Sequence, residues 1–364
     1  MSIGRVVRRT AGALALAVLA FFALVPTGRY LVRAGLAEAR ILGRARPIAE
    51  MVRDPSTTPA TRRKLELVLA ARAFAADSVK LSAKQSFTTY SHIDRDTLVV
   101  VLSAAYRDKL AYKSWWFPIV GSVPYKGYFD VRDAKRAAAD LSRDGFDAYL
   151  RPASAFSTLG YLNDPVLSTT VDEDSVSLVN TVIHELTHNT FYASGQAVFN
   201  ESFANFVGAH GSEWFYSMRG DSASVALAQR DWVRQKTLGR FWSAVYGSVD
   251  SAFTAHPASK AERLAARDIV FAGARARFAF EIEPTLPGFD STKHLTLHLD
   301  NASLMSRRMY RTGLDDFDAI YERVGRRLPA AIARIIRLAR SRPDDPYAAV
   351  RADVESGSPE PAAQ

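Results

Sequence analysis

The fold is decided by the stretch Val182–His188, which reads VIHELTH. Apolar residues around it recur every three or four positions, as they do on one face of a helix. The acidic residues 172–174 suit the start of such a helix, and Gly195 suits its end. On this helix His184 and His188 lie one turn apart and point the same way. The stretch therefore predicts a helix that presents two imidazoles to one metal ion.

Glu185 follows the first of these histidines and is expected beside the open position of a catalytic metal. There its carboxylate can take a proton from a water molecule at the metal. A catalytic Zn²⁺ has three protein ligands and one open position, whereas a structural Zn²⁺ has four protein ligands. A third ligand is therefore needed from a nearby element.

The segment Asn200–Ala204, NESFA, offers Glu201 as that third ligand, with twelve residues between it and His188. Gly195 allows a turn, and Asn200 suits the cap of a second helix. If the second helix runs antiparallel to the first, Glu201 returns to the metal. Asn205, one turn further on, is expected to hydrogen-bond a ligand and hold it in place.

Two alternatives bear on this interpretation. The histidines and glutamates can be ordinary residues of a polar helix face, because short motifs of this kind arise by chance. The other common zinc pattern, with Gly and a third His soon after the motif, is absent, since Phe191 and Ser194 stand at those positions. The chain has no cysteine, so any metal must bind His, Asp or Glu.

The 364 residues suit one large domain or two ordinary ones, and the net charge is +9. The positive charge is concentrated in two segments: residues 1–53 carry +7 and residues 323–342 carry +7, while residues 54–322 carry −1 and residues 343–364 carry −4. This distribution favours two segments near anionic lipid and argues against a nucleic-acid-binding face. Solvated arginine-rich surfaces are the alternative.

Residues Thr10–Val25 form a sixteen-residue run without charge, preceded by Arg5, Arg8 and Arg9. We interpret the run as an uncleaved membrane anchor. A cleaved signal, a buried core helix and a twin-Arg export signal are the alternatives. The expected location is the bacterial inner membrane, with the catalytic domain on the periplasmic side.

The predicted fold class is α+β, mostly helical with a small β-sheet. Strands are expected at 98–102 and 147–156, short strands and turns at 115–129, a helix at 131–143 and a loop at 159–170. From residue 172 onward the chain is expected to be mostly helical. The predicted organisation is a membrane segment over 1–28, a helical region over 29–90, a catalytic domain over 91–330, and a basic helix with a disordered tail over 331–364.

Residues His184–His188 together with Phe199–Ala204 resemble the gluzincin pattern of thermolysin-like and aminopeptidase-N-like enzymes. The segments Val123–Phe129 (VPYKGYF) and Ser157–Ser168 (STLGYLNDPVLS) resemble the bacterial putative aminopeptidase family, and the resemblance covers roughly residues 29–325. It implies a zincin-like, membrane-tethered peptidase acting outside the cytoplasm. Members of that family are often lipoproteins, but without cysteine the apolar run itself must be the anchor here.

Candidates for stabilising an oxyanion are Tyr310, His294 and His298. The stretch from Asp300-Asn301-Ala302 to Tyr310 resembles a downstream block of the same family, so Tyr310 is selected. A half-buried core tyrosine is its alternative reading. For His294 and His298 a β-strand with one polar face is favoured, and His210 is expected to be structural.

These observations predict a membrane-anchored zinc peptidase, an aminopeptidase or oligopeptidase that hydrolyses peptides. One rival is a zinc endopeptidase acting on membrane-proximal proteins. A second rival is a non-catalytic envelope protein, binding or chaperone-like, with a structural zinc. Glu185 argues against the second rival, because a structural site has no use for a base.

Overall fold

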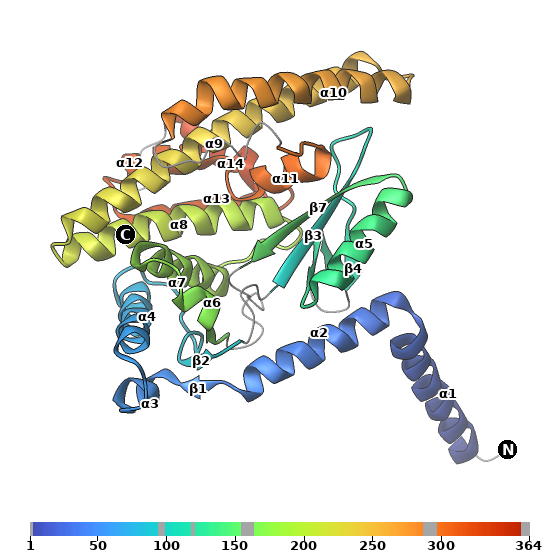
Figure 1. The fold of residues 1–364 in the computed structure, drawn as a ribbon, viewed down its shortest axis with the longest axis horizontal. Helices are drawn as coiled ribbons and strands as arrows, with labels where there is room; N and C mark the ends of the chain where they lie inside the picture. Colours follow the sequence, from blue (N-terminus) through green and yellow to red (C-terminus); the bar gives the residue numbers. More distant parts are fainter. Residues whose placement is uncertain (1–2, 94–98, 118–120, 154–163, 287–296, 358–364) are drawn as a thin grey trace.

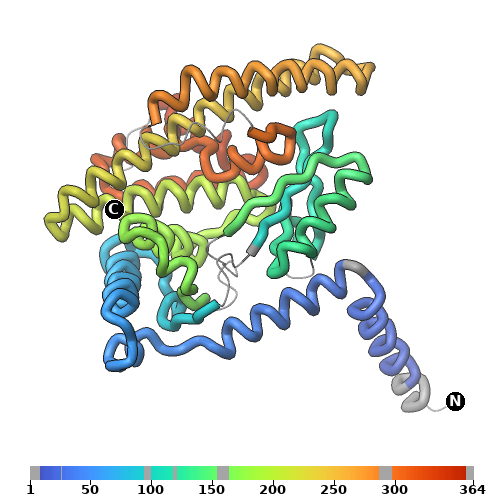
Figure 2. Tube along the Cα trace, viewed as in Figure 1, coloured from blue at the N-terminus to red at the C-terminus, as the bar shows by residue number. Residues whose placement is uncertain are grey.

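A computed structural model describes residues 3–93, 99–117, 121–153, 164–286 and 297–357. The described chain is mostly helical with three small sheets, which confirms the α+β prediction (Figures 1 and 2). The earlier helices are α1 (Ile3–Leu24), α2 (Pro26–Gly43), α3 (Ile48–Arg53), α4 (Pro59–Asp77), α5 (Val131–Arg143), α6 (Ser168–Val171) and α7 (Ser175–Thr190). The later helices are α8 (Ala197–Met218), α9 (Ser222–Ala255), α10 (Lys260–Arg277), α11 (Asn301–Met309), α12 (Leu314–Arg323), α13 (Leu328–Ser341) and α14 (Pro346–Ser356).

The described strands form three sheets. The first sheet has the order β1 (Arg46–Pro47), β2 (Thr89–Ser91), β8 (Val166–Leu167), and the second has the order β6 (Tyr125–Tyr128), β3 (Val99–Tyr106), β7 (Phe146–Ala153). A hairpin of β4 (Trp115–Phe117) and β5 (Gly121–Val123) is the third. The strands expected at 98–102 and 147–156 are confirmed as β3 and β7 within the described residues. The loop expected at 159–170 is wrong for residues 166–170, because β8 pairs with the distant strand β2 and α6 follows it directly.

Different helices pack on the two faces of the central sheet β6–β3–β7. On one face Leu102 and Leu150 pack against α5 through Leu141. On the other face Ala105 of β3 packs with Ala302 and Met305 of α11. Because side chains alternate along a strand, residues two apart from these share their face. The sheet thus has one face that only supports α5 and one that is turned toward α11 (Figure 1).

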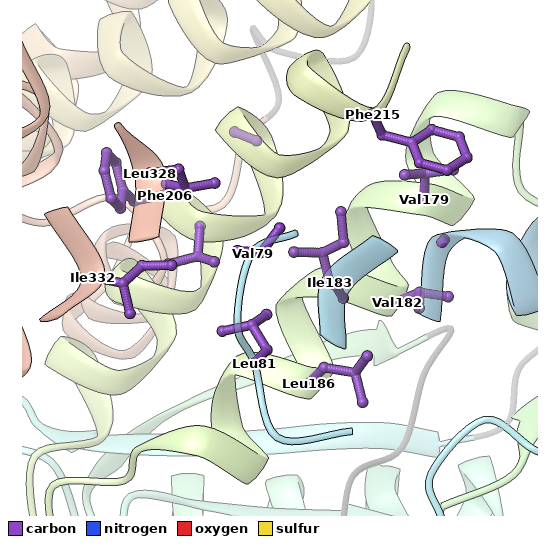
Figure 3. Packing of buried hydrophobic residues seen from close by; sticks show 14 of the residues in the cluster. Val79, Leu81, Val179, Val182, Ile183, Leu186, Phe206, Phe215, Leu328 and Ile332 are labelled. Atoms are coloured by element: carbon purple, nitrogen blue, oxygen red, sulfur yellow. The ribbon is translucent and has the colours of Figure 1, made fainter. Parts of the chain in front are cut away.

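The helical body is built around α7 and α8. Apolar residues from α4, α7, α8, α12 and α13 form one large buried cluster, and Figure 3 shows part of it, with Ile183, Phe206 and Ile332 among the labelled side chains. The two central helices run antiparallel, since Tyr216 bonds Ser175 at one end while Glu201 meets His188 at the other. The helices expected beyond residue 172 are confirmed, and this pair carries the candidate site.

Gly208 of α8 allows the two helices to approach closely. A Cβ atom at this position would lie 2.7 Å from Oδ1 of Asn180 on α7, whereas a Cβ at Gly273 of α10 meets nothing within 4 Å. Gly208→Ala is therefore expected to destabilise the fold by about 1–3 kcal/mol through overpacking, although alanine favours helices. Gly273→Ala, the matched control, should stabilise by about 0.5–1 kcal/mol. Urea unfolding measures both, and a stabilising Gly208→Ala would show that the contact is not tight.

The long helices α9 and α10 lie side by side across one side of the body (Figure 1). In the core between them and α11, Trp242 stacks on Phe278, and Phe241 meets both rings edge-on. A π-helical turn (Phe278–Ile282) and a 3-10 turn (Glu283–Thr285) follow α10. This hairpin covers α11 and so fixes the element that ends at Tyr310.

The C-terminal segment is more ordered than predicted. The disordered tail expected for the last dozen residues is wrong for residues 353–356, which belong to α14. Asp345 caps this helix by accepting from the backbone N–H of Ala348, and Pro346 starts it. Arg334 of α13 is buried and forms an ion pair with Asp353 at 2.8 Å. This long-range pair, invisible in local sequence, binds α14 to the body.

The N-terminal helices meet at a sharp bend. A Cβ at Gly28 would overlap the carbonyl oxygen of Phe21, so this close approach needs glycine. Tyr30 packs on Phe117 and Tyr128, which attaches α2 to the central sheet. No single helix in the described ranges has the length and apolarity to cross a membrane. The bent pair Arg9–Leu24 and Thr27–Gly43, at 80°, meets that test only when taken together.

Candidate metal centre

Helix α7 presents the two predicted histidines and Glu185. Oδ1 of Asp174 caps the helix by accepting from the backbone N–H groups of Val176 and Ser177, so the predicted start is confirmed. The predicted end at Gly195 is wrong, because α7 stops at Thr190. Gly195 instead has φ +75° in the turn between the helices, a conformation that favours glycine.

Helix α8 brings Glu201 to the histidines, as the sequence predicted. Oε2 of Glu201 lies 3.4 Å from Nε2 of His184 and 3.7 Å from Nε2 of His188. Asn200 does not cap α8, which begins at Ala197. Its side-chain amide binds both the N–H and the carbonyl of Ala193, at 2.9 and 2.8 Å. Asn200 therefore fixes the connecting turn and, through it, the position of Glu201.

The three donor atoms fit one small cation. One donor atom from each of His184, His188 and Glu201 lies within 4.8 Å of the other two. Donors about 2.0–2.2 Å from a tetrahedral zinc stand about 3.3–3.6 Å apart, close to the two distances above. Burial alone would raise the pKa of Glu201, but hydrogen bonds and charges of the two histidines hold that pKa well below its usual range. An ionised carboxylate beside two imidazoles is a donor set that suits Zn²⁺.

Glu185 carries a buried oxygen without a protein partner. Its Oε2 has no hydrogen-bond partner among the residues that the structure describes. A buried carboxylate oxygen left unpaired destabilises the fold by about 1–3 kcal/mol or more, so such atoms are expected where a bound molecule supplies the partner. Glu185 therefore points to a ligand-binding position next to His184.

Tyr310 lies at the end of α11 and is brought to the same place. Its ring centre is 6.1 Å from that of His184, and its hydroxyl accepts a hydrogen bond from Nη2 of Arg151 at 2.7 Å. Burial, followed by the charge of Glu201, raises the pKa of Tyr310 well above its usual range. The phenol is therefore protonated at neutral pH and keeps its proton available for donation.

Asn205 has a different partner from the one expected. Its Nδ2 donates to the backbone carbonyl of Tyr310 at 2.8 Å, so it does not hold a ligand directly. Ser202, from the same helix, donates to the carbonyl of Met309 at 2.9 Å and accepts from the N–H of Thr312 at 3.1 Å. The helix that carries Glu201 thus fixes the chain around Tyr310.

Two residues near the site escaped the sequence analysis. Arg151 on β7 and Tyr125 on β6 share the face of the central sheet that is turned toward α11, by their register with Val101 and Ser103 of β3. Burial and then Glu201 raise the pKa of Tyr125 well above its usual range. A charged arginine inside a predicted strand was the available signal for Arg151, but its neighbours depend on strand pairing.

The other histidines in the described part of the chain lie outside this group. His298 is 73% exposed by its side chain and bonds Asp300 at 2.9 Å. The strand favoured around it is wrong for residues 297–300, which have no regular structure because Asp300 caps α11. His294 lies outside the described residues. His210 is buried on α8 and binds Asp318 at 2.9 Å, where it has a structural position as expected.

A polar cavity of about 370 Å³ lies between α7, α8 and α9, one helical turn from His184 and Glu201. Its carboxylates are already engaged by the protein: Glu173 accepts from Thr181, Asp174 caps α7, and Asp231 pairs with Arg234. The cavity therefore does not single out an acid for binding a peptide's free amine.

Comparison with known proteins gives one match. A family model described as "Putative aminopeptidase" matches residues 29–349. No curated protein and no solved structure matches the chain.

Proposed function

The chain belongs to the family described as "Putative aminopeptidase", and on that premise we propose that it is a gluzincin-type, zinc-dependent peptidase. The family supports peptidase activity, and the proposal adds the metal and the mechanism. The observation that carries it is the convergence of His184, His188 and Glu201, with the unpaired carboxylate oxygen of Glu185 beside them. Three ligands leave one position of a tetrahedral ion for water or substrate.

Each residue then has a distinct task. His184, His188 and Glu201 would hold the zinc, and the ion supplies Lewis-acid polarisation of a carbonyl and of water. Glu185 accepts the proton of the attacking water and returns it to the leaving amine. Tyr310 donates its phenolic hydrogen to the oxygen that gains negative charge. Asn205 and Ser202 keep Tyr310 in reach of that oxygen.

Two rival functions use the same residues. An endopeptidase would cleave blocked peptides, whereas an aminopeptidase requires a free amine. A non-catalytic protein with structural zinc would leave Glu185 without a task, yet its oxygen is buried and unpaired among the described residues. Assaying the full chain on matched peptides with free and acetylated amino ends, with and without a chelator, separates the three. We expect cleavage that requires the free amine and is lost when the chelator is added. Cleavage that depends neither on the free amine nor on the metal would refute the proposal.

We also propose that α1 and α2 attach the enzyme to the bacterial inner membrane, with the catalytic part in the periplasm. Leu14, Leu16 and Leu19 of α1 are all more than 60% exposed, which leaves an apolar surface uncovered by protein. The exposed face of α2 combines Val32 and Leu36 with basic residues that suit anionic headgroups, Arg29 and Arg40.

Replacing one exposed leucine with a charge tests this attachment. Leu16→Lys should weaken binding of the full chain to vesicles containing anionic lipid by roughly 100-fold, because a lysine at mid-membrane costs about 2.5–3.5 kcal/mol. Val233→Lys, on the exposed surface of α9, is the matched control and should leave binding unchanged. Vesicle flotation measures both. Equal binding of the two variants would show that α1 does not enter the bilayer.

A further inference from the structure

Four partly buried arginines surround Tyr310 without a carboxylate partner. Other arginines in the interior do have such a partner, for example Arg267 with Asp147 and Arg334 with Asp353. Within the described ranges, no carboxylate lies within 4.0 Å of the four guanidinium groups, which belong to Arg151, Arg307, Arg308 and Arg311. Unpaired buried cations are costly, so this region is expected to bind an anion.

The charges of Arg307 and Arg151 both act on Arg311. Burial, followed by the positive charge of Arg307, lowers the pKa of Arg311 to about 10. Arg307 and Arg308 lie over the rings of Trp242 and Tyr246, at 5.1 and 3.8 Å, so aromatic faces take the place of carboxylates. The result is a region of one charge sign with low-dielectric walls, which attracts an anion more strongly than an open surface does.

Arg151 is the member of this group nearest the candidate metal centre. It stands on β7, on the sheet face turned toward α11, and its Nη2 donates to the hydroxyl of Tyr310 at 2.7 Å. Its guanidinium carbon is 5.1 Å from the Tyr310 ring centre, which is 6.1 Å from the His184 ring centre. An extended peptide advances about 3.3–3.6 Å per residue, so Arg151 lies within about three residues of His184.

The hydrogen bond to Tyr310 uses only part of the donor capacity of the Arg151 side chain. The hydroxyl uses one of five N–H donors, and the buried Nε–H has no partner among the described residues. Arginine is suited to carboxylates because its donors form a planar fork that can bind both oxygens. A carboxylate arriving from the substrate would supply the missing partner.

We propose, on the basis of the proposed function, that Arg151 binds a carboxylate of the substrate one to three residues beyond the scissile bond. The carboxyl terminus of a short peptide is the source that this distance favours, and an acidic side chain has the same chemistry. The substrates are then di- to tetrapeptides with a free carboxyl end. Arg307, Arg308 and Arg311 strengthen the local positive field without touching the substrate.

The test compares three dipeptide forms: Leu-Ala with a free carboxylate, Leu-Ala amide, and Leu-Glu amide. Binding is measured by calorimetry in the full chain carrying Glu185→Gln, so that no turnover interferes. Arg151→Met, added to that background, should weaken binding of the free acid by about 10- to 100-fold and leave the amide within about twofold. Loss confined to Leu-Glu amide would assign the contact to an acidic side chain. Arg151→Lys should recover part of the affinity, because it restores the charge.

Tyr310→Phe is the matched control, since it removes the other half of the Arg151–Tyr310 hydrogen bond. In the otherwise unchanged chain it should lower the turnover of acid and amide alike, and in the Glu185→Gln background it should leave the ratio of their affinities unchanged. If Arg151→Met behaves in the same way as Tyr310→Phe, the arginine acts only through the tyrosine and the inference is overturned. Binding is read without hydrolysis, so an inactive wild type would defeat the proposed function but not this inference.

Discussion

Glu185→Gln is expected to lower kcat for peptide hydrolysis by about 10²–10⁴-fold while the protein keeps its zinc. Glutamine has the same shape as glutamate but cannot accept the proton of the attacking water. Glu185 is half-buried, and its buried Oε2 has no hydrogen-bond partner among the described residues, so no protein contact depends on the negative charge of that oxygen. Steady-state kinetics with a free-amine peptide, together with metal analysis of the same sample, measures both quantities.

The matched control for this variant is Glu262→Gln, a glutamate of α10 whose side chain is 65% exposed. It makes the same chemical change away from the site and should leave kcat within about twofold, as surface substitutions usually do. If Glu185→Gln were as active as this control, Glu185 would not be the base. If it lost zinc as well as activity, its role would be in the metal site.

His188→Ala is expected to lower zinc affinity by more than the roughly 10- to 100-fold that substitutions around metal ligands typically cause. It removes one of three ligands and leaves Glu201 buried with one imidazole. Activity should fall in parallel, because the metal and the reaction share one site. Competition with a fluorescent chelator measures the affinity.

His298→Ala is the control for this second substitution, because the side chain of His298 is exposed and lies outside the ligand group. It should leave both zinc affinity and activity unchanged. Folding must be checked by circular dichroism, since His188 is buried among core residues of α7. A folded His188→Ala protein with full zinc affinity would contradict the assignment of His188 as a ligand.

Much of the site follows from local sequence. The helical spacing around His184 and His188 fixes their common direction, and the acidic cap fixes where α7 begins. The short connection through Gly195 pointed to Glu201, and the family resemblance pointed to Tyr310; the structure brings both to the histidines. The two histidines and Glu201 need only a helix of known direction and one short connection, whereas Tyr310 depends on long-range packing.

The errors concern side chains with more than one available partner. An asparagine such as Asn200 can cap a helix or stabilise a turn equally well. Only the folded structure shows that its partner is Ala193 in the turn. Asn205 was expected at a ligand, but Tyr310 lies closer to it in space, although far away in sequence. Local patterns do not distinguish between such partners.

The position of Arg151 could not be predicted from local sequence patterns. Its place near Glu201 depends on the register of β7 with β3 and on the packing of α11 against that sheet. Both are long-range contacts without a sequence motif. Helix α14 is a similar case, since it is bound to the body through the distant pair Arg334–Asp353.

The central claim is that one zinc ion binds between α7 and α8. Crystals of the full chain, grown with zinc and measured on both sides of the zinc absorption edge, test it most directly. We predict one strong anomalous peak within about 2.0–2.2 Å of Nε2 of His184, Nε2 of His188 and an oxygen of Glu201. No peak there, or a peak whose ligands are other residues, would contradict the account.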